Sequence, residues 1–131
     1  MEGNRPSKRK VVVIGAAIAD ITGFSSNPLI SDDSNPGQVK FSSGGVGRNI
    51  AENLARLNCQ VELITAFGND VYAHGLKSHC EAAGIIIENS LFSTAFSTSI
   101  YLSINNTDGN MALAISDTRI IDELNSAFLE E

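Results

Sequence analysis

A glycine cluster opens directly into an amphipathic helix at Gly44-Gly45-Val46-Gly47-Arg48-Asn49-Ile50-Ala51-Glu52-Asn53-Leu54-Ala55-Arg56-Leu57. Ile50, Leu54 and Leu57 recur at helical spacing and form one apolar face. Glycine lets the backbone come close to a ligand, and the start of a helix offers free N–H groups and the positive end of its dipole. The stretch therefore predicts a helix over 46–57 whose first turn can hold a polar, oxygen-rich small molecule.

Short apolar runs on either side of this helix predict strands. Residues 11–14 and 61–67 are such runs, each ends in a glycine, and a third run begins at 85–87. Between the second and third runs we expect another helix, with Asn69 or Asp70 as its N-terminal cap. Because strands and helices alternate, the sequence predicts an α/β fold with a parallel sheet and right-handed crossovers. Three strands make a thin sheet, so we expect this sheet to be incomplete.

The pattern changes after this unit. Residues 98–104 and 111–116 alternate between apolar and small or polar side chains, and a turn at 106–110 separates them. This predicts an antiparallel hairpin with one apolar face, made of Thr98, Ile100, Leu102, Ile104, Met111, Leu113 and Ile115. Residues 23–38 are predicted to be loop, with a short strand at 39–41. A last helix is predicted over 123–130, capped by Asp122.

Composition narrows the class of protein. The chain has 131 residues, enough for one domain, and 43% of them are hydrophobic. Residues 1–10 hold four of the nine basic residues and are predicted to be a flexible N-terminus. The acidic remainder argues against nucleic-acid binding, and no apolar run has the length of a membrane span or a signal peptide. We therefore expect a cytoplasmic protein, with Cys59 and Cys80 as buried free thiols.

The glycine turn and the first strand resemble the N-terminal signature of the ribokinase-like (PfkB) carbohydrate kinases. That signature has a Gly-Gly pair, a small residue, an Asn two positions on, another small residue and a later Gly, which here are Gly44, Gly45, Gly47, Asn49, Ala51 and Gly68. Asp20 follows the first strand, where the family keeps a sugar-binding Asp. Within the family, the resemblance is to the subgroup that acts on pseudouridine. Ile18 departs from the family, since many relatives have an Asn there, and Thr118 departs from the subgroup.

The resemblance implies a three-layer ribokinase-like core with a small β lid. Residues 11–131 would be the substrate-binding half, with lid segments near 35–41 and 97–116. The substrate-binding residues implied are Asp20, Gly44, Gly45, Asn49, Thr98 and Asp117. The family's catalytic Asp, anion hole and most of its ATP site lie in its C-terminal half, so we expect no catalytic residue in this chain and no activity from these 131 residues alone. ATP and Mg²⁺ are the cofactors implied for the full-length enzyme.

The function implied is phosphorylation of a ribose 5′-hydroxyl, with pseudouridine as the first substrate and ribose, another nucleoside or a ketohexose as alternatives. A truncated, non-catalytic binding or assembly module is a further alternative. Asp20 can also be a turn residue and Asn49 a helix cap. Arg48 is expected to be an exposed helix charge, and both histidines are expected at the surface. A homodimer through the β lid is the partner we expect, and which face of the hairpin meets the ligand stays open.

Overall fold

The computed structural model describes residues 10–131. The predicted flexible segment 1–10 therefore lies outside the described residues, apart from Lys10. That residue begins strand β1, and its ammonium lies 2.5 Å from a carboxylate oxygen of the buried Glu62. For Lys10 the prediction is wrong, because a buried carboxylate fixes its side chain.

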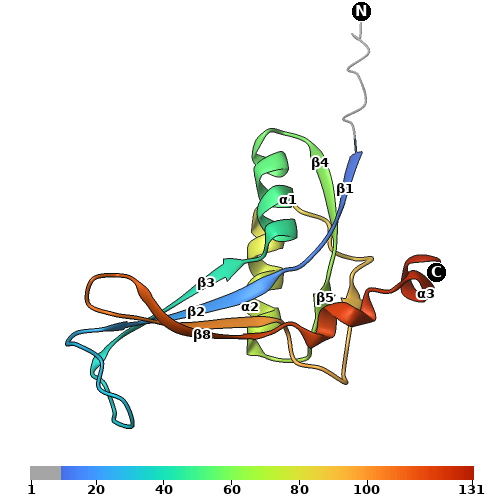
Figure 1. The fold of residues 1–131 in the computed structure, drawn as a ribbon. Helices are drawn as coiled ribbons and strands as arrows, with labels where there is room; N and C mark the ends of the chain where they lie inside the picture. Colours follow the sequence, from blue (N-terminus) through green and yellow to red (C-terminus); the bar gives the residue numbers. More distant parts are fainter. Residues whose placement is uncertain (1–9) are drawn as a thin grey trace, which may run out of the picture.

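A parallel α/β unit forms the body of the chain (Figure 1). Strand β1 (Lys10–Ile14) pairs in parallel with β4 (Gln60–Ile64), and β5 (Ala66–Phe67) pairs in parallel with β6 (Leu91–Phe92). Helices α1 (Val46–Arg56) and α2 (Val71–Ala82) supply the crossovers. The α/β class is confirmed. Of the third predicted strand, only one parallel bridge forms, between Ile86 and Glu62.

The predicted strand over 61–67 is interrupted at Thr65. Its hydroxyl accepts a hydrogen bond from the backbone N–H of Ala17 at 2.9 Å, and its own N–H donates to the hydroxyl of Ser90 at 3.1 Å. Thr65 therefore bonds to side-chain and backbone groups outside the β1–β4 ladder. The sheet divides there into two short parallel pairs.

A four-stranded sheet, which we call the projecting sheet, extends to one side of the helices (Figure 1). Its order is β3 (Gly37–Gly44), β2 (Ile18–Ser25), β7 (Ile100–Asn105) and β8 (Met111–Asp117). The predicted hairpin is confirmed as the antiparallel pair β7–β8. The predicted loop over 23–38 is wrong at both ends, because β2 runs to Ser25 and β3 begins at Gly37.

The projecting sheet has two chemically different faces, because paired residues in a ladder share a face. The polar face carries Asp20, Thr22, Lys40, Ser42, Tyr101, Ser103 and Ser116. The apolar face carries Ile21, Val39, Phe41, Ile100, Leu102, Ile104, Leu113 and Ile115. The predicted alternation is confirmed except at Thr98, which precedes β7, and at Met111. A register shift between Ile104 and Asn105 moves Met111 to the polar face, where its sulfur accepts from the hydroxyl of Tyr101.

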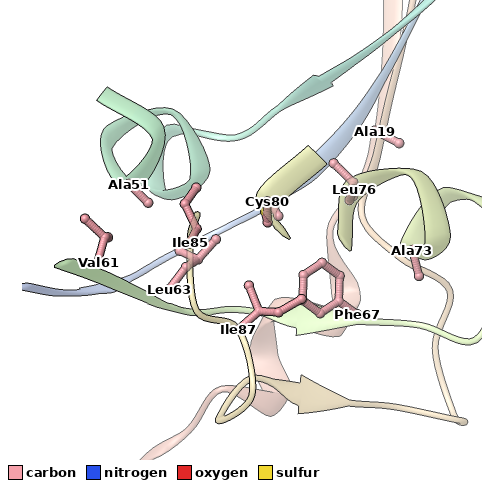
Figure 2. Close-up of a cluster of buried hydrophobic side chains, with 11 residues drawn as sticks. Ala19, Ala51, Val61, Leu63, Phe67, Ala73, Leu76, Cys80, Ile85 and Ile87 are labelled. Carbon is pink, nitrogen blue, oxygen red and sulfur yellow. The ribbon is translucent and has the colours of Figure 1, made fainter. Parts of the chain in front are cut away.

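The hydrophobic core lies between the two helices and the parallel strands (Figure 2). Its members are Ala17, Ala19, Ala51, Val61, Leu63, Phe67, Ala73, Leu76, Cys80, Ile85 and Ile87. Cys59 and Cys80 are free thiols, and the prediction of burial is confirmed for Cys80 but wrong for Cys59, which is partly exposed. Asp70 is the cap of α2, because its carboxylate accepts from the N–H of Ala73 at 2.9 Å.

The C-terminal segment differs from its prediction. A short 3₁₀ helix, η1 (Arg119–Glu123), precedes a single turn, α3 (Ser126–Leu129). The cap of α3 is Asn125, whose side chain accepts from the N–H of Phe128, so the predicted helix over 123–130 with Asp122 as cap is wrong. The chain leaves helical geometry at Leu124, where ψ is 56°. Residues 10–131 contain no helix long and apolar enough to cross a bilayer.

Candidate functional site

The glycine turn presses the start of α1 against the segment between β1 and β2. A Cβ atom on Gly47 would lie 2.8 Å from the backbone of Gly15, and one on Gly45, whose φ is +94°, would lie 2.3 Å from the carbonyl oxygen of Ala16. The N–H of Arg48 donates to that same carbonyl at 3.1 Å. Only glycine tolerates these approaches. The turn thus fixes the first turn of α1 beside the start of β2, which carries Asp20.

Asp20 lies on the polar face of the projecting sheet, directly over Gly44. A Cβ atom on Gly44 would lie 2.0 Å from Oδ2 of Asp20, so the carboxylate occupies the space that any other side chain at position 44 would need. Within residues 10–131 no hydrogen bond to this carboxylate is formed. Burial raises the pKa of Asp20, and the positive charge of Arg48 partly opposes that rise. The carboxylate is a hydrogen-bond acceptor that is left open to a ligand.

Asn49 sits in the first turn of α1 with an exposed side chain. It does not cap the helix, because the N-cap position of α1 is Gly45 and no side chain caps it. Its Oδ1 atom accepts a hydrogen bond from the guanidinium of Arg48 at 2.6 Å. The turn therefore presents a fixed carboxamide beside the carboxylate-bearing strand.

Arg48 is buried, with 8% of its side chain exposed, so the prediction of an exposed helix charge is wrong. It pairs at 2.7 Å with Glu52, whose other oxygen pairs at 2.5 Å with Arg56. Sequence reasoning missed the role of Arg48. The sequence does contain a signal for it: Arg48, Glu52 and Arg56 are spaced four residues apart, which places their side chains on one stripe of the helix.

Thr98 has no free hydroxyl to offer a ligand. It is fully buried, its Oγ1 donates to Asp70 at 2.8 Å, and the same oxygen accepts from the N–H of Gly68 at 2.9 Å. Asp70 also accepts from the N–H of Thr98, so this network ties the start of α2 to the chain leading into β7. The geometry gives Thr98 a structural role.

Asp117 also lies apart from Asp20. Its register partner is Ile100, on the apolar face of the projecting sheet. Both of its carboxylate oxygens accept from the guanidinium of Arg119, at 2.9 and 2.8 Å. The structure therefore packs Asp20 against Gly44 and holds Asn49 through Arg48, whose charge also acts on Asp20, whereas Thr98 and Asp117 bond to other protein groups.

Tyr101 and Ser42 are further polar neighbours of Asp20 that sequence reasoning did not assign to the site. They flank it on β7 and β3 in the ladder register. Among the described residues no group of three His, Cys, Asp or Glu side chains converges as a metal site. His74 and His79 are exposed as predicted, and Nδ1 of His79 is hydrogen-bonded to the hydroxyl of Ser43.

Comparison with solved structures gives the class of protein. The chain superposes on a Clostridium perfringens protein assigned as a sugar kinase, with a TM-score of 0.87 and 35% identity over 96% of this chain and 40% of that one. It shares its fold with a ribokinase from Cryptococcus neoformans solved in complex with ADP (TM-score 0.71, 23% identity, 85% of this chain and 34% of that one). The fold is that of the ribokinase-like kinases.

The chain belongs to the pfkB family of carbohydrate kinases, whose model matches residues 8–130. A curated relative, the pseudouridine kinase of Escherichia coli (strain K12), is 40% identical over 124 residues. That match covers 95% of this chain and 40% of the relative. The chain thus corresponds to well under half of the length of its relatives.

Proposed function

We propose that the full-length protein is an ATP-dependent kinase that phosphorylates a hydroxyl of a sugar or nucleoside, and that pseudouridine is its substrate. The observation that carries this proposal is the carboxylate of Asp20. It is half-buried and has no hydrogen-bond partner within residues 10–131. It also lies over Gly44, at a position where any side chain larger than a hydrogen atom would clash with it. Membership of the pfkB family and 40% identity to a pseudouridine kinase support the reaction and the substrate.

The contribution of this part of the protein is positioning. An ionised carboxylate accepts hydrogen bonds and an amide N–H donates them, so Asp20 and Asn49 together match sugar hydroxyls, which do both. Holding the sugar fixes the position of the hydroxyl that is to react. ATP is the phosphoryl donor of the proposed reaction, with Mg²⁺ neutralising its phosphates. We assign no residue of this chain to either.

A coupled ADP-release assay on the full-length protein tests the proposal. The panel is pseudouridine, uridine, ribose and a ketohexose, because uridine has the same ribose with a different glycosidic bond. We expect the highest kcat/KM with pseudouridine. A higher kcat/KM with another compound of the panel would support the kinase activity but show that pseudouridine is not the substrate. Absence of ADP release with every compound, alongside calorimetric binding of one of them, would favour the non-catalytic binding module instead.

We also propose that the projecting sheet is a lid whose polar face covers the ligand and whose apolar face pairs with a second copy. Several side chains of the apolar face are exposed in this chain. The exposed fraction is 75% for Val39, 63% for Ile115 and 55% for Leu113. A hollow of about 600 Å³ lies at its tip, between Val39 and Leu113 on the sheet and Leu29 in the adjoining loop. Contiguous apolar surface of this kind is costly to leave in water, which favours a paired sheet.

Light scattering with an edge-strand variant tests the dimer. Ile115→Glu places a charge on the apolar face without entering the core, and we expect it to convert a dimeric full-length protein to monomer at micromolar concentration. Ser116→Glu is the matched control, because Ser116 is the next residue on the same strand and faces the opposite way. A monomeric wild type, or an Ile115→Glu protein that stays dimeric, would rule out this interface.

A further inference from the structure

The guanidinium of Arg48 determines which end of the Asn49 carboxamide is available to a ligand. A guanidinium has hydrogen-bond donors only, so the atom of Asn49 that faces it at 2.6 Å must be the oxygen. The NH₂ group of Asn49 then points away from Arg48. Within residues 10–131 this NH₂ group forms no hydrogen bond. Asn49 is thereby held as a donor.

The position of Arg48 is itself fixed. One terminal nitrogen donates to Glu52 at 2.7 Å while the other donates to Asn49, so both arms of the guanidinium are engaged. Glu52 stays ionised to hold it, because the hydrogen bond from Arg48 lowers the pKa of Glu52. A lysine has one ammonium nitrogen and lacks this planar fork, so it is not an equivalent replacement. Burial of the Arg48 side chain limits the water that can compete from the arginine side of these part-buried bonds.

We propose that Arg48, whose charge also acts on Asp20, is a positioning residue that locks Asn49 as a hydrogen-bond donor while Asp20 is the acceptor, so that the site selects a hydroxyl able to accept from one and donate to the other. This inference rests on the proposed function. It explains a buried arginine in the first turn of α1, where a positive charge is disfavoured by the helix dipole. Without Arg48, the carboxamide is free to turn its oxygen toward the ligand, where it repels the hydroxyl oxygen.

A double-mutant cycle in the full-length protein tests this coupling. The variants are Arg48→Met, Asn49→Ala and the double variant, measured with the substrate that the protein phosphorylates, at a pH well above the carboxylate range. Arg48→Met is expected to raise KM about tenfold with a much smaller change in kcat, the size expected for one lost hydrogen bond. In the Asn49→Ala background the same change should have little further effect, because Arg48 acts through Asn49. An undiminished effect in that background would overturn the proposal.

Arg56→Met is the matched control. Arg56 also pairs with Glu52, but its side chain is 73% exposed and its guanidinium bonds to Glu52 and not to Asn49. Removing this exposed pair should leave KM within about twofold of the wild type. A rise in KM equal to that of Arg48→Met would show that the charge row, and not the orientation of Asn49, is responsible, and would overturn the proposal.

A crystal structure of full-length Arg48→Met separates this inference from the proposed function, because it needs no activity. We expect the α1 backbone to be unchanged and the Asn49 carboxamide to leave its wild-type orientation. An unmoved carboxamide would overturn the inference even in an active kinase. A moved carboxamide in a protein that phosphorylates none of the panel would support the inference about orientation while the proposed function fails.

Discussion

Replacing Asp20 with Ala in the full-length protein is expected to lower kcat/KM for the nucleoside by about a hundredfold, since a ligand hydroxyl would lose a charged acceptor in a partly dry site. Steady-state kinetics with ADP release measure this. The fold should survive, because the carboxylate makes no hydrogen bond within residues 10–131 and lies at the surface of the projecting sheet. Asp122→Ala, which removes an exposed carboxylate on η1, is the control and should leave kcat/KM unchanged. A folded Asp20→Ala protein with wild-type kcat/KM would show that the site is misplaced.

The titration of Asp20 gives the same site a pH signature. Burial raises the pKa of its carboxyl, so protonation begins at a higher pH than for an ordinary Asp. Because the ionised form is the acceptor, kcat/KM should fall as the pH drops through this raised pKa. Arg48 opposes the rise, so the acidic limb should move to still higher pH in Arg48→Met. This limb should be absent from Asp20→Ala.

Gly47→Ala is expected to lower the stability of the protein. The new Cβ would lie 2.8 Å from both the Cα and the carbonyl carbon of Gly15, and backbone atoms cannot turn aside as a side chain can. Either α1 moves away from the β1–β2 connection or the connection distorts. Overpacking of this kind costs about 1–3 kcal/mol or more. Denaturant unfolding of the full-length protein measures the change.

Gly75→Ala is the matched control for that variant. Gly75 lies within α2, and its added Cβ would meet only the ring of Phe41, at 3.8 Å, an ordinary van der Waals contact. Replacing glycine by alanine inside a helix stabilises it by about 0.5–1 kcal/mol. The two variants should therefore shift the unfolding midpoint in opposite directions. A Gly47→Ala protein as stable as the wild type would contradict the close packing of the glycine turn.

The elements that sequence predicted best are those whose signal is local. The glycine turn into α1, the β-branched run of β1 and the Asp70 cap each depend on residues that are adjacent or one helical turn apart. Strand β2 was missed because Asp20 and Gly23 interrupt its apolar pattern. It exists because β3 and β7 pair with it on both sides, and β7 begins 75 residues beyond the end of β2. Long-range pairing of this kind overrides local propensity.

The same difference between local and long-range signals explains which site residues could be predicted from the sequence. Asp20, Gly44 and Asn49 are predicted from spacing and from the family resemblance, and the structure packs Asp20 against Gly44. Thr98 is predicted to contact the ligand from its place in the hairpin. Its partner Asp70 lies 28 residues away, so the sequence gives no sign that its hydroxyl is already used. The burial of Arg48 was missed for the opposite reason, since a charge on an amphipathic helix is normally solvated.

A crystal structure of the full-length protein with pseudouridine bound is the most direct test of the proposed substrate site. We predict that the carboxylate of Asp20 and the NH₂ group of Asn49 each lie within hydrogen-bond distance of a ribose hydroxyl, with the polar face of the projecting sheet over the nucleoside. A nucleoside bound in an ordered position that contacts neither Asp20 nor Asn49 would contradict the proposed site.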